Sequence, residues 1–372
     1  MLAADKAPGD EGLAWRFEGQ VQEISLHHPD LDRQSWRDVR LEAASQGRFF
    51  PRQSRWQIDA GRFGFPGLPV AVMGFVQGGE APSGSLSFQV SDWPCSDLVG
   101  HAPGSLRGAL WGLALEGRLA AAMDVTFDAA DWEKLALDVR FPSLCHVTRD
   151  PEPLAADLSP LQTGAAPVST RSDLPLSPRQ PGFTPLQSIP PHVRAAFLTA
   201  EDAGFFLHHG FEPEHMRRAL VHNLERGRLA RGASTITQQV AKNLFLSHER
   251  TLARKLAEAV LTWRLDALVP KPRMLELYLN LVELGPGIHG VGEAARVYFG
   301  KAPEALTPLE AAHLASLPPN PRGFARRFRD GSVDEGWLAR LYDLVGIMGR
   351  RGHLSPADVA AARGAKLQLR KI

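Results

Sequence analysis

Two glutamates, Glu201 and Glu258, stand at either end of a stretch that is rich in polar and cationic side chains. Apolar residues surround the first glutamate, since the run 195–198 precedes it and Phe205 follows it. A carboxylate among apolar side chains tends towards a raised pKa, which suits a general base at neutral pH. The alternative for such a glutamate is a salt bridge or an acid in the first turn of a helix.

Arg254 and Lys255 precede Glu258 by four and three positions, so on a helix both cations share a face with the carboxylate. Arginine before glutamate at this spacing braces a helix less well than the reverse order, which favours a binding site over a simple salt bridge. Such a group can bind a divalent cation together with a diphosphate, or orient two cations towards phosphate oxygens.

Short hydroxyl and amide side chains crowd the stretch 232–243. Residues of this kind are poor helix formers and favour caps and loops. With Lys242 they can form a polar cradle for sugar hydroxyls and phosphate oxygens, helped by a helix N-terminus. A glycine-hinged loop in solvent is the alternative. The residues are Ser234, Thr235, Thr237, Gln238, Gln239 and Asn243.

The sequence 285–290 fits the pattern G-x-G-x-x-G, but residues 274–284 before it have a helical pattern. A dinucleotide fingerprint needs a preceding strand and a βαβ unit, so we predict a loop between helices instead. The histidines show no zinc-ligand spacing, and no structural zinc is expected.

The formal net charge is +1, yet twelve Lys and Arg face only four acids between residues 215 and 273. This excess predicts an anionic ligand or an anionic membrane surface, with solvated helix faces as the alternative. No apolar run approaches the roughly 18–20 residues that span a bilayer. The chain is therefore expected to be soluble or to lack an upstream anchor. Cys95 and Cys145 can form one disulfide or remain two buried thiols, and both alternatives stay open.

The elements that must position these residues differ along the chain of 372 residues, a length that favours two domains. Apolar residues alternate with period two through residues 1–149, which predicts antiparallel strands with one buried and one exposed face. Residues 150–187 are rich in proline and predict a semi-extended linker. Residues 188–372 have helical periodicity, and capping boxes at Thr307 and Ser355 mark two helix starts. The predicted fold class is thus α+β and multidomain, with an antiparallel β-rich domain, a linker and an all-α domain.

Five motifs in the helical half, taken in order, resemble those of glycosyltransferase family 51, the peptidoglycan glycosyltransferases. They are Glu201-Asp202-x-x-Phe205-x-x-His208-x-Gly210, Gly232-x-Ser234-Thr235-x-Thr237-Gln238-Gln239-x-x-Lys242-Asn243, Arg254-Lys255-x-x-Glu258, Tyr278-Leu-Asn280 with Gly290 and Ala294-Ala295-x-x-Tyr298-Phe299-Gly300-Lys301, and Leu306-Thr307-x-x-Glu310-Ala311-Ala312. The chain departs from the family at Ala233, Thr262 and Asp266. It contains no S-x-x-K or K-T-G, so no transpeptidase is expected.

The resemblance implies a lysozyme-like fold and an inverting transferase that polymerises lipid II into glycan strands, with release of undecaprenyl diphosphate, in cell-wall biogenesis. It implies that Glu201 accepts the proton of the acceptor hydroxyl. Glu258 would stabilise the leaving diphosphate with Arg254, Lys255 and Lys242, through Mg²⁺ or another divalent cation held at Glu258. The remaining residues implied to bind substrate are Asp202, Phe205, His208, Ser234, Thr235, Thr237, Gln238, Gln239, Asn243 and Asn280.

The resemblance also implies partners and a location. The partners are lipid II, the growing glycan strand, a membrane surface and other cell-wall synthesis proteins, and no nucleic acid is expected. The location is the periplasmic face of the cytoplasmic membrane, with the anchor absent from or upstream of this chain. The first 149 residues are similar to AsmA-type envelope proteins in stretches such as 84–88, and their role is left open. The alternatives are a catalytically silent envelope scaffold or lipid-binding protein, and a glycan hydrolase.

Overall fold

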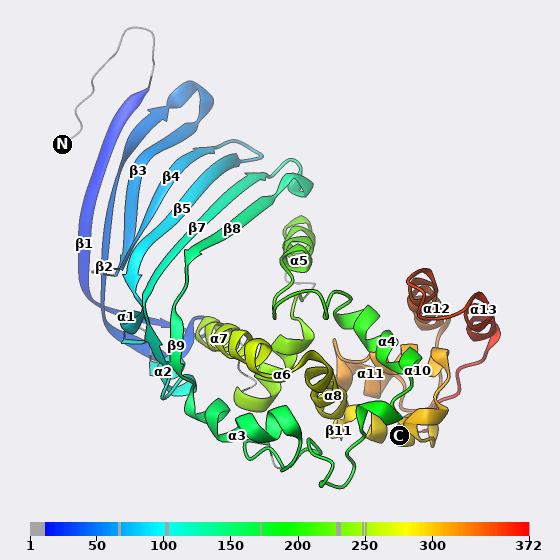
Figure 1. Ribbon diagram of the computed structural model, residues 1–372. Coiled ribbons are helices and arrows are strands. Elements are labelled where there is room, and N and C mark those ends of the chain that lie inside the picture. Colours follow the sequence, from blue (N-terminus) through cyan, green and yellow to red (C-terminus); the bar gives the residue numbers. More distant parts are fainter. Residues whose placement is uncertain are drawn as a thin grey trace. The chain divides into compact units, whose positions relative to one another are not determined.

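The computed structural model describes residues 12–65, 68–100, 104–171, 173–227, 232–247, 249 and 251–371. The chain divides into two compact units, and each is assembled from three chain segments. Unit 1 comprises Met1–Glu152, Pro213–Ala233 and Glu249–Ala257. Unit 2 comprises Pro153–Glu212, Ser234–His248 and Glu258–Ile372. Figure 1 shows a sheet in the first unit and mainly helices in the second. The described residues include no helix long and apolar enough to cross a membrane.

Unit 1 is built on a seven-stranded sheet in which every strand pairs antiparallel with its neighbours, as the alternating pattern predicts. The strands, in spatial order, are β1 (Leu13–His28), β2 (Asp32–Phe50), β3 (Arg55–Phe65), β4 (Leu68–Gln77), β5 (Ser83–Pro94), β7 (Arg118–Asp128) and β8 (Ala136–Ser143). Figure 1 shows the sheet as a single curved layer. Smaller elements complete the N-terminal segment: η1 (Pro51–Gln53), α1 (Cys95–Gly100), α2 (Gly104–Ala109), η2 (Trp132–Lys134), and the paired strands β6 (Ala114–Glu116) and β9 (His146–Arg149).

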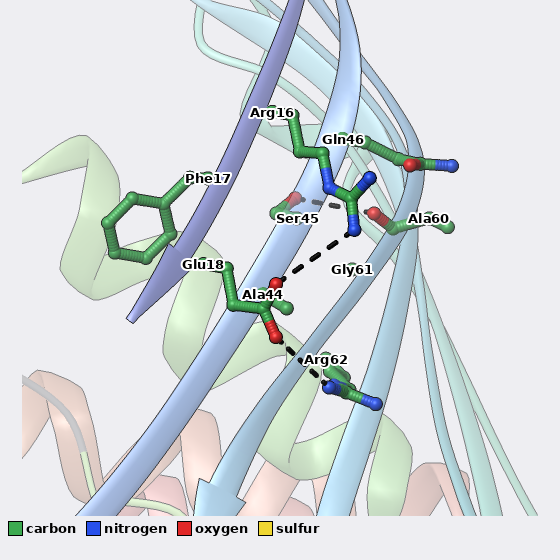
Figure 2. Close-up of a pocket in the computed structure, with 9 residues that line it drawn as sticks. All are labelled: Arg16, Phe17, Glu18, Ala44, Ser45, Gln46, Ala60, Gly61 and Arg62. Atoms are coloured by element: carbon green, nitrogen blue, oxygen red, sulfur yellow. Dashed lines mark hydrogen bonds and ion pairs between the residues drawn. The ribbon is translucent and has the colours of Figure 1, made fainter. Parts of the chain in front are cut away.

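The two faces of the sheet differ sharply in polarity, because residues paired across antiparallel strands point to the same side. One face carries the rows Trp15–Gly47–Ile58–Gly74–Leu86–Val125–Leu137 and Phe17–Ser45–Gly61–Val72–Phe88–Met123–Val139. The opposite face carries the row Glu18–Ala44–Arg62–Ala71–Gln89–Ala122–Arg140. In Figure 2, Phe17 points away from the side chains of Arg16, Glu18 and Arg62, which line a pocket on the polar side. We call the first side the apolar sheet face.

The apolar sheet face is not buried, and here the prediction of one buried face was wrong. Phe17 is 56% exposed, Phe63 44% and Val139 45%. Aromatic rings pack along the surface, with the Trp15 and Trp56 rings 6.0 Å apart across the bare backbone of Gly47. Alternation shows that a sheet has an apolar side, but it does not show whether anything covers that side.

A disulfide joins Cys95, the first residue of α1, to Cys145 between β8 and β9. Of the two alternatives left open by the sequence, the structure contains the disulfide. The bond ties the end of β5 to the end of β8, with 50 positions of chain between the two cysteines.

Two later segments also belong to unit 1. They carry α5 (Pro213–Glu225) and the first turn of α7 (Leu252–Leu268). Arg217 on α5 makes its ion pair with Glu214 at 3.1 Å, and its guanidinium also donates to the backbone carbonyl of Glu133. The backbone N–H groups of Leu252 and Ala253 donate to the carbonyls of Asp30 and Leu31, at 2.8 and 3.1 Å. The turn between β1 and β2 therefore holds the N-terminus of α7.

Unit 2 is helical, as predicted, around a buried apolar core. Its helices are α3 (Glu152–Thr163), α4 (Pro191–Glu201), α6 (Ile236–Phe245), the rest of α7, α8 (Lys271–Leu281), α9 (Gly290–Phe299), α10 (Pro308–Ala315), α11 (Pro321–Arg327), α12 (Glu335–Arg350) and α13 (Pro356–Gly364), with single turns η3 (Leu186–Ser188) and η4 (Pro303–Ala305). Both predicted capping boxes are present, at the starts of α10 and α13. Where a loop was predicted over 285–290, a small hairpin of β10 (Glu283–Gly285) and β11 (Ile288–His289) precedes α9.

The predicted linker 150–187 is not an extended spacer, because most of it packs into unit 2. It contains α3, and the side chains of Leu154, Leu161 and Leu176 are fully buried. Arg273 on α8 donates to the carbonyls of Leu161, at 3.0 Å, and Leu176, at 2.8 Å. The Asp157 carboxylate accepts backbone N–H bonds from residues 169 and 170. Proline removes backbone donors, but the carbonyls that remain find buried partners here.

Candidate active site

Glu201 is the last residue of α4, and the fold fixes its position from both sides. The helix begins at Pro191, with Pro190 as its N-cap, and its buried face of Val193, Ala196 and Phe197 packs into the core of unit 2. The Glu201 side chain is half-buried, and the Gln239 amide donates to its Oε2 from Nε2 at 2.7 Å.

Burial raises the pKa of the Glu201 carboxyl above its usual value, as predicted from the apolar residues around it. The Gln239 hydrogen bond and the nearby Lys242 ammonium lower the pKa and so oppose this effect in part. The Asp202 carboxylate raises the pKa, and Arg340 on α12 lowers it. The result is a carboxylate that is more basic than usual and is surrounded by polar groups.

Asp202 holds the site together instead of facing outward. Its carboxylate accepts a hydrogen bond from the backbone N–H of Ile236, the first residue of α6, at 2.9 Å. It accepts a second hydrogen bond from His208 Nε2 at 2.9 Å. Both side chains are almost fully enclosed, with 1% of Asp202 and 7% of His208 exposed. The ring of Phe205, itself 1% exposed, packs edge-on against the His208 ring. These three predicted substrate-binding residues thus join the end of α4 to the N-terminus of α6.

The predicted polar cradle over 232–243 is divided by the fold into two groups. Thr235 caps α6, since its hydroxyl accepts the N–H of Gln238 while the Gln238 side chain accepts the N–H of Thr235. The same hydroxyl donates to the carbonyl of Gly210 at 2.6 Å, and Thr237 lies beside Asp266. The buried side chains of Thr235 and Gln238 thus form the helix cap and that of Thr237 faces Asp266, contacts that differ from the sugar-binding role predicted for them.

The second group of the cradle consists of partly exposed side chains on α6 and just before it. Gln239, Lys242 and Asn243 are half-buried, and Ser234 is half-buried just before the helix. Gln239 donates a hydrogen bond to the Glu201 carboxylate, and the Lys242 ammonium lowers the pKa of that carboxyl, so α6 presents an amide and a cation to Glu201. The Asn243 carbonyl accepts from the Arg171 guanidinium at 2.7 Å.

Arg254, Lys255 and Glu258 all lie in the first two turns of α7, as the sequence spacing predicts. The Glu258 side chain is only 2% exposed. The described residues contain no group of three or more His, Cys, Asp and Glu able to hold a metal ion by themselves. A single carboxylate does fit Mg²⁺ in the manner in which one or two carboxylates and substrate phosphates share the ion.

Asn280 does not fit the predicted role in substrate binding, because its side-chain amide is fully engaged within unit 2. It donates to the carbonyls of Thr184, at 2.9 Å, and Glu276, at 2.8 Å, and it accepts the N–H of Thr184 at 2.8 Å. Both donors of the amide are therefore used. Asn280 clamps α8 to the chain that leads into α4.

Two further residues at Glu201 were not predicted as site residues. Tyr278 is completely buried, and among the described residues its hydroxyl has no hydrogen-bond partner. Burial and the carboxylates of Glu201 and Asp202 raise its pKa well above the usual value. The place of Tyr278 in the fourth motif is the sequence feature that could have identified it as a site residue. Arg340 lies on α12, outside every motif, and the sequence carries no signal for its approach to Glu201.

Comparison with known proteins identifies similar chains. The family model described as "Transglycosylase" matches residues 170–340. A "Biosynthetic peptidoglycan transglycosylase" of Nitrosospira multiformis is 41% identical over 163 residues, which cover 44% of this chain and 69% of the relative. A protein of the same name from Azoarcus sp. is 48% identical over 146 residues, covering 39% of this chain and 63% of the relative. "Penicillin-binding protein 1A" of Escherichia coli is 49% identical over 139 residues, 37% of this chain and 16% of that protein. The residues matched by the family model, 170–340, do not include the strands of the sheet in unit 1.

Proposed function

The chain belongs to the transglycosylase family, and we propose that it polymerises lipid II into the glycan strands of peptidoglycan, releasing polyprenyl diphosphate. The match covers 63% of the length of the Azoarcus relative, so the activity rests on this match and on the site. The single observation that carries the proposal is the basic Glu201 carboxylate, held by Gln239 and flanked by Lys242. The lysozyme-like arrangement implied by the resemblance is proposed for unit 2.

In the proposed reaction, Glu201 accepts the proton of the acceptor sugar's 4-hydroxyl as its oxygen bonds to the donor's anomeric carbon. The bond from that carbon to the diphosphate oxygen breaks, and the configuration inverts. Burial of Glu201 supports this role, because a carboxyl with a raised pKa is a stronger base once it is ionised. The amide of Gln239 fixes the carboxylate that receives the proton.

The negative charge that develops on the leaving diphosphate needs cations close to it. Arg254 and Lys255 on α7 and Lys242 on α6 are the residues proposed to bind its oxygens. Glu258 is proposed to hold Mg²⁺ together with those oxygens, and the ion would supply further charge stabilisation. Charge of this kind is of little use to a glycan hydrolase, whose leaving group is a neutral sugar.

The substrate is a membrane lipid, and unit 1 exposes apolar helix faces that suit a membrane surface. Met216, Leu220 and Leu224 on α5 follow one another at intervals of four residues and are 37–45% exposed. Leu252 and Leu256 on α7 are 50% and 45% exposed. The disulfide is typical of an oxidising compartment. We therefore place the activity at the periplasmic face of the cytoplasmic membrane.

Turnover of fluorescent lipid II in detergent with Mg²⁺ tests the proposal directly. The parent protein should form glycan polymer that lysozyme digests, and Glu201→Gln should form none. A folded parent that binds lipid II without forming polymer would overturn the proposal in favour of a lipid-binding scaffold. Shortening of added glycan strands would instead identify a hydrolase.

A further inference from the structure

The apolar sheet face is a feature of the described residues that the proposed reaction does not use. Its rows run across all seven strands, and Ser45 is the one polar side chain in the two central rows. Six inter-strand spacings of about 4.8 Å and the eight steps from Leu13 to Val21 at about 3.3 Å each outline a face of roughly 760 Å². Soluble monomers usually expose apolar patches of only about 300–600 Å², and larger ones mark binding surfaces.

The polar side of the same strands is charged and solvated. Glu18 makes ion pairs with Arg62 at 3.8 Å and with Arg16 at 3.9 Å. Dashed lines mark both pairs in Figure 2. Arg140 pairs with Asp138 at 3.1 Å. A sheet this asymmetric has one side suited to water and one suited to hydrocarbon. A peptide is a poor occupant for the apolar sheet face, because its backbone N–H and C=O groups would lose water and gain no partner there.

The position of α7 indicates which hydrocarbon the face meets. The turn between β1 and β2 accepts the N–H groups of Leu252 and Ala253, so the first turn of α7 is fixed to one end of the sheet. Arg254 and Lys255, the proposed diphosphate ligands, are the next two residues of that helix, and they belong to unit 1 like the sheet. A diphosphate held by these cations has its polyprenyl chain attached at the β1–β2 turn end of the sheet, and seven residues of β1, roughly 23 Å, separate His28 at that end from Val21 in the first apolar row.

We propose that the apolar sheet face binds the polyprenyl chain of the lipid-linked substrate whose diphosphate is held at Arg254 and Lys255. The inference rests on the proposed function, since that function supplies a diphosphate with a long hydrocarbon chain. Successive rows follow one another along β1 and β2, from the Val21–Leu41 pair on the side of the β1–β2 turn to the Leu13–Phe49 pair at the far end. The long polyprenyl chain lies across the apolar sheet face and covers side chains that water otherwise contacts.

The test uses the full chain and a C55 polyprenyl phosphate with a photoreactive group in its hydrocarbon chain. After irradiation, mass spectrometry should map the attached label to residues of the apolar sheet face, and unlabelled polyprenyl phosphate should compete. A phospholipid with the same group in its acyl chain is the second arm. Equal labelling of the face by both lipids would overturn the choice of a polyprenyl chain, and labelling elsewhere would overturn the site.

Two double variants, each adding two carboxylates, test the two faces of the sheet separately. Phe63→Glu with Val139→Glu places carboxylates on the apolar sheet face, while Gln89→Glu with Ala136→Glu places them on exposed positions of the polar side. The first pair should lower polyprenyl labelling about tenfold, because an unpaired carboxylate is costly beside hydrocarbon. The second pair should leave labelling unchanged. Equal effects of the two pairs would contradict the proposal.

Two measurements keep this inference separate from the proposed activity. Labelling requires no turnover, so it reports on the face even in Glu201→Gln. Polymer formation from C55 lipid II and from a short-chain analogue gives the second readout. The apolar-face variant should raise the KM for the C55 substrate and leave that for the short-chain analogue unchanged. Sedimentation of the parent completes the test, because a stable dimer that hides Phe17 and Val139 would assign the face to a second copy.

Discussion

Gln239 Nε2 lies 2.7 Å from Glu201 Oε2, and this hydrogen bond joins the first turn of α6 to the last residue of α4. The amide stabilises the ionised carboxylate, while burial stabilises the protonated form. The basicity of Glu201 is therefore set by two opposed effects, and each can be changed separately.

Removal of the Glu201 carboxylate should abolish polymer formation. We expect Glu201→Gln to lower the rate by about 10²–10⁴-fold, the range typical of general bases. Turnover of fluorescent lipid II measures the rate. Glu304→Gln, which changes an exposed glutamate in η4, is the matched control and should retain the parent rate.

The pH dependence of turnover should follow the Glu201 carboxyl. The base must be ionised, so activity is present above its raised pKa and is lost as the pH falls through it. Gln239→Leu and Lys242→Met each remove a group that lowers this pKa, and the acidic limb should move to higher pH in both. Lys366→Met, an exposed control near the C-terminus, should leave the profile in place. A limb that stays fixed in the first two variants would exclude Glu201 as the titrating group.

Glu258 should couple activity to the divalent cation. Chelation with EDTA is expected to slow the parent, and added Mg²⁺ should restore its rate. Glu258→Ala should be slow under both conditions and respond little to Mg²⁺, because the ion loses its protein carboxylate. Isothermal titration with Mg²⁺ and a soluble polyprenyl diphosphate analogue gives a readout without turnover. A variant that responds to Mg²⁺ like the parent would show that the ion binds elsewhere.

Asn280 should matter for stability more than for substrate binding. Asn280→Ala leaves the Thr184 N–H and the Thr184 carbonyl without their partner, and each unsatisfied group costs about 1–3 kcal/mol. Thermal unfolding should show a lowered Tm, while the KM for lipid II at a temperature where the variant is folded should match the parent. An unchanged Tm with a raised KM would restore the substrate-binding role predicted from the sequence.

The disulfide should stabilise unit 1 in particular. Closing a loop of 50 positions contributes about 4 kcal/mol in the chain-entropy description. Cys95→Ser with Cys145→Ser should therefore lower the denaturant midpoint of the sheet, followed by intrinsic tryptophan fluorescence, since six of the eight tryptophans lie in residues 1–149. Dithiothreitol should shift the parent to the same midpoint and leave the variant unchanged.

The sequence predicts elements well where the determining interactions are local. The capping boxes at Thr307 and Ser355 need only residues three positions apart, and both are present. The alternation of apolar residues likewise predicts the strands, since pleating alone places every second side chain on one face.

The errors concern interactions between distant parts of the chain. The proline-rich segment 150–187 looked like a linker because Arg273, which binds its carbonyls, lies about a hundred residues away. The amide of Asn280 looked available for the same reason, since Thr184 is remote in sequence. Arg340 approaches Glu201 only through the packing of α12, so no motif contains it.

The order of strands in the sheet also bears on the order in which the sheet and α7 can fold during synthesis. Apart from the excursion through β6, every strand pairs with the one made just before it, so the sheet can grow one hairpin at a time. The β1–β2 turn is thus finished more than two hundred residues before Leu252 emerges to bond with it. An early-folding sheet serves as the template on which α7 starts.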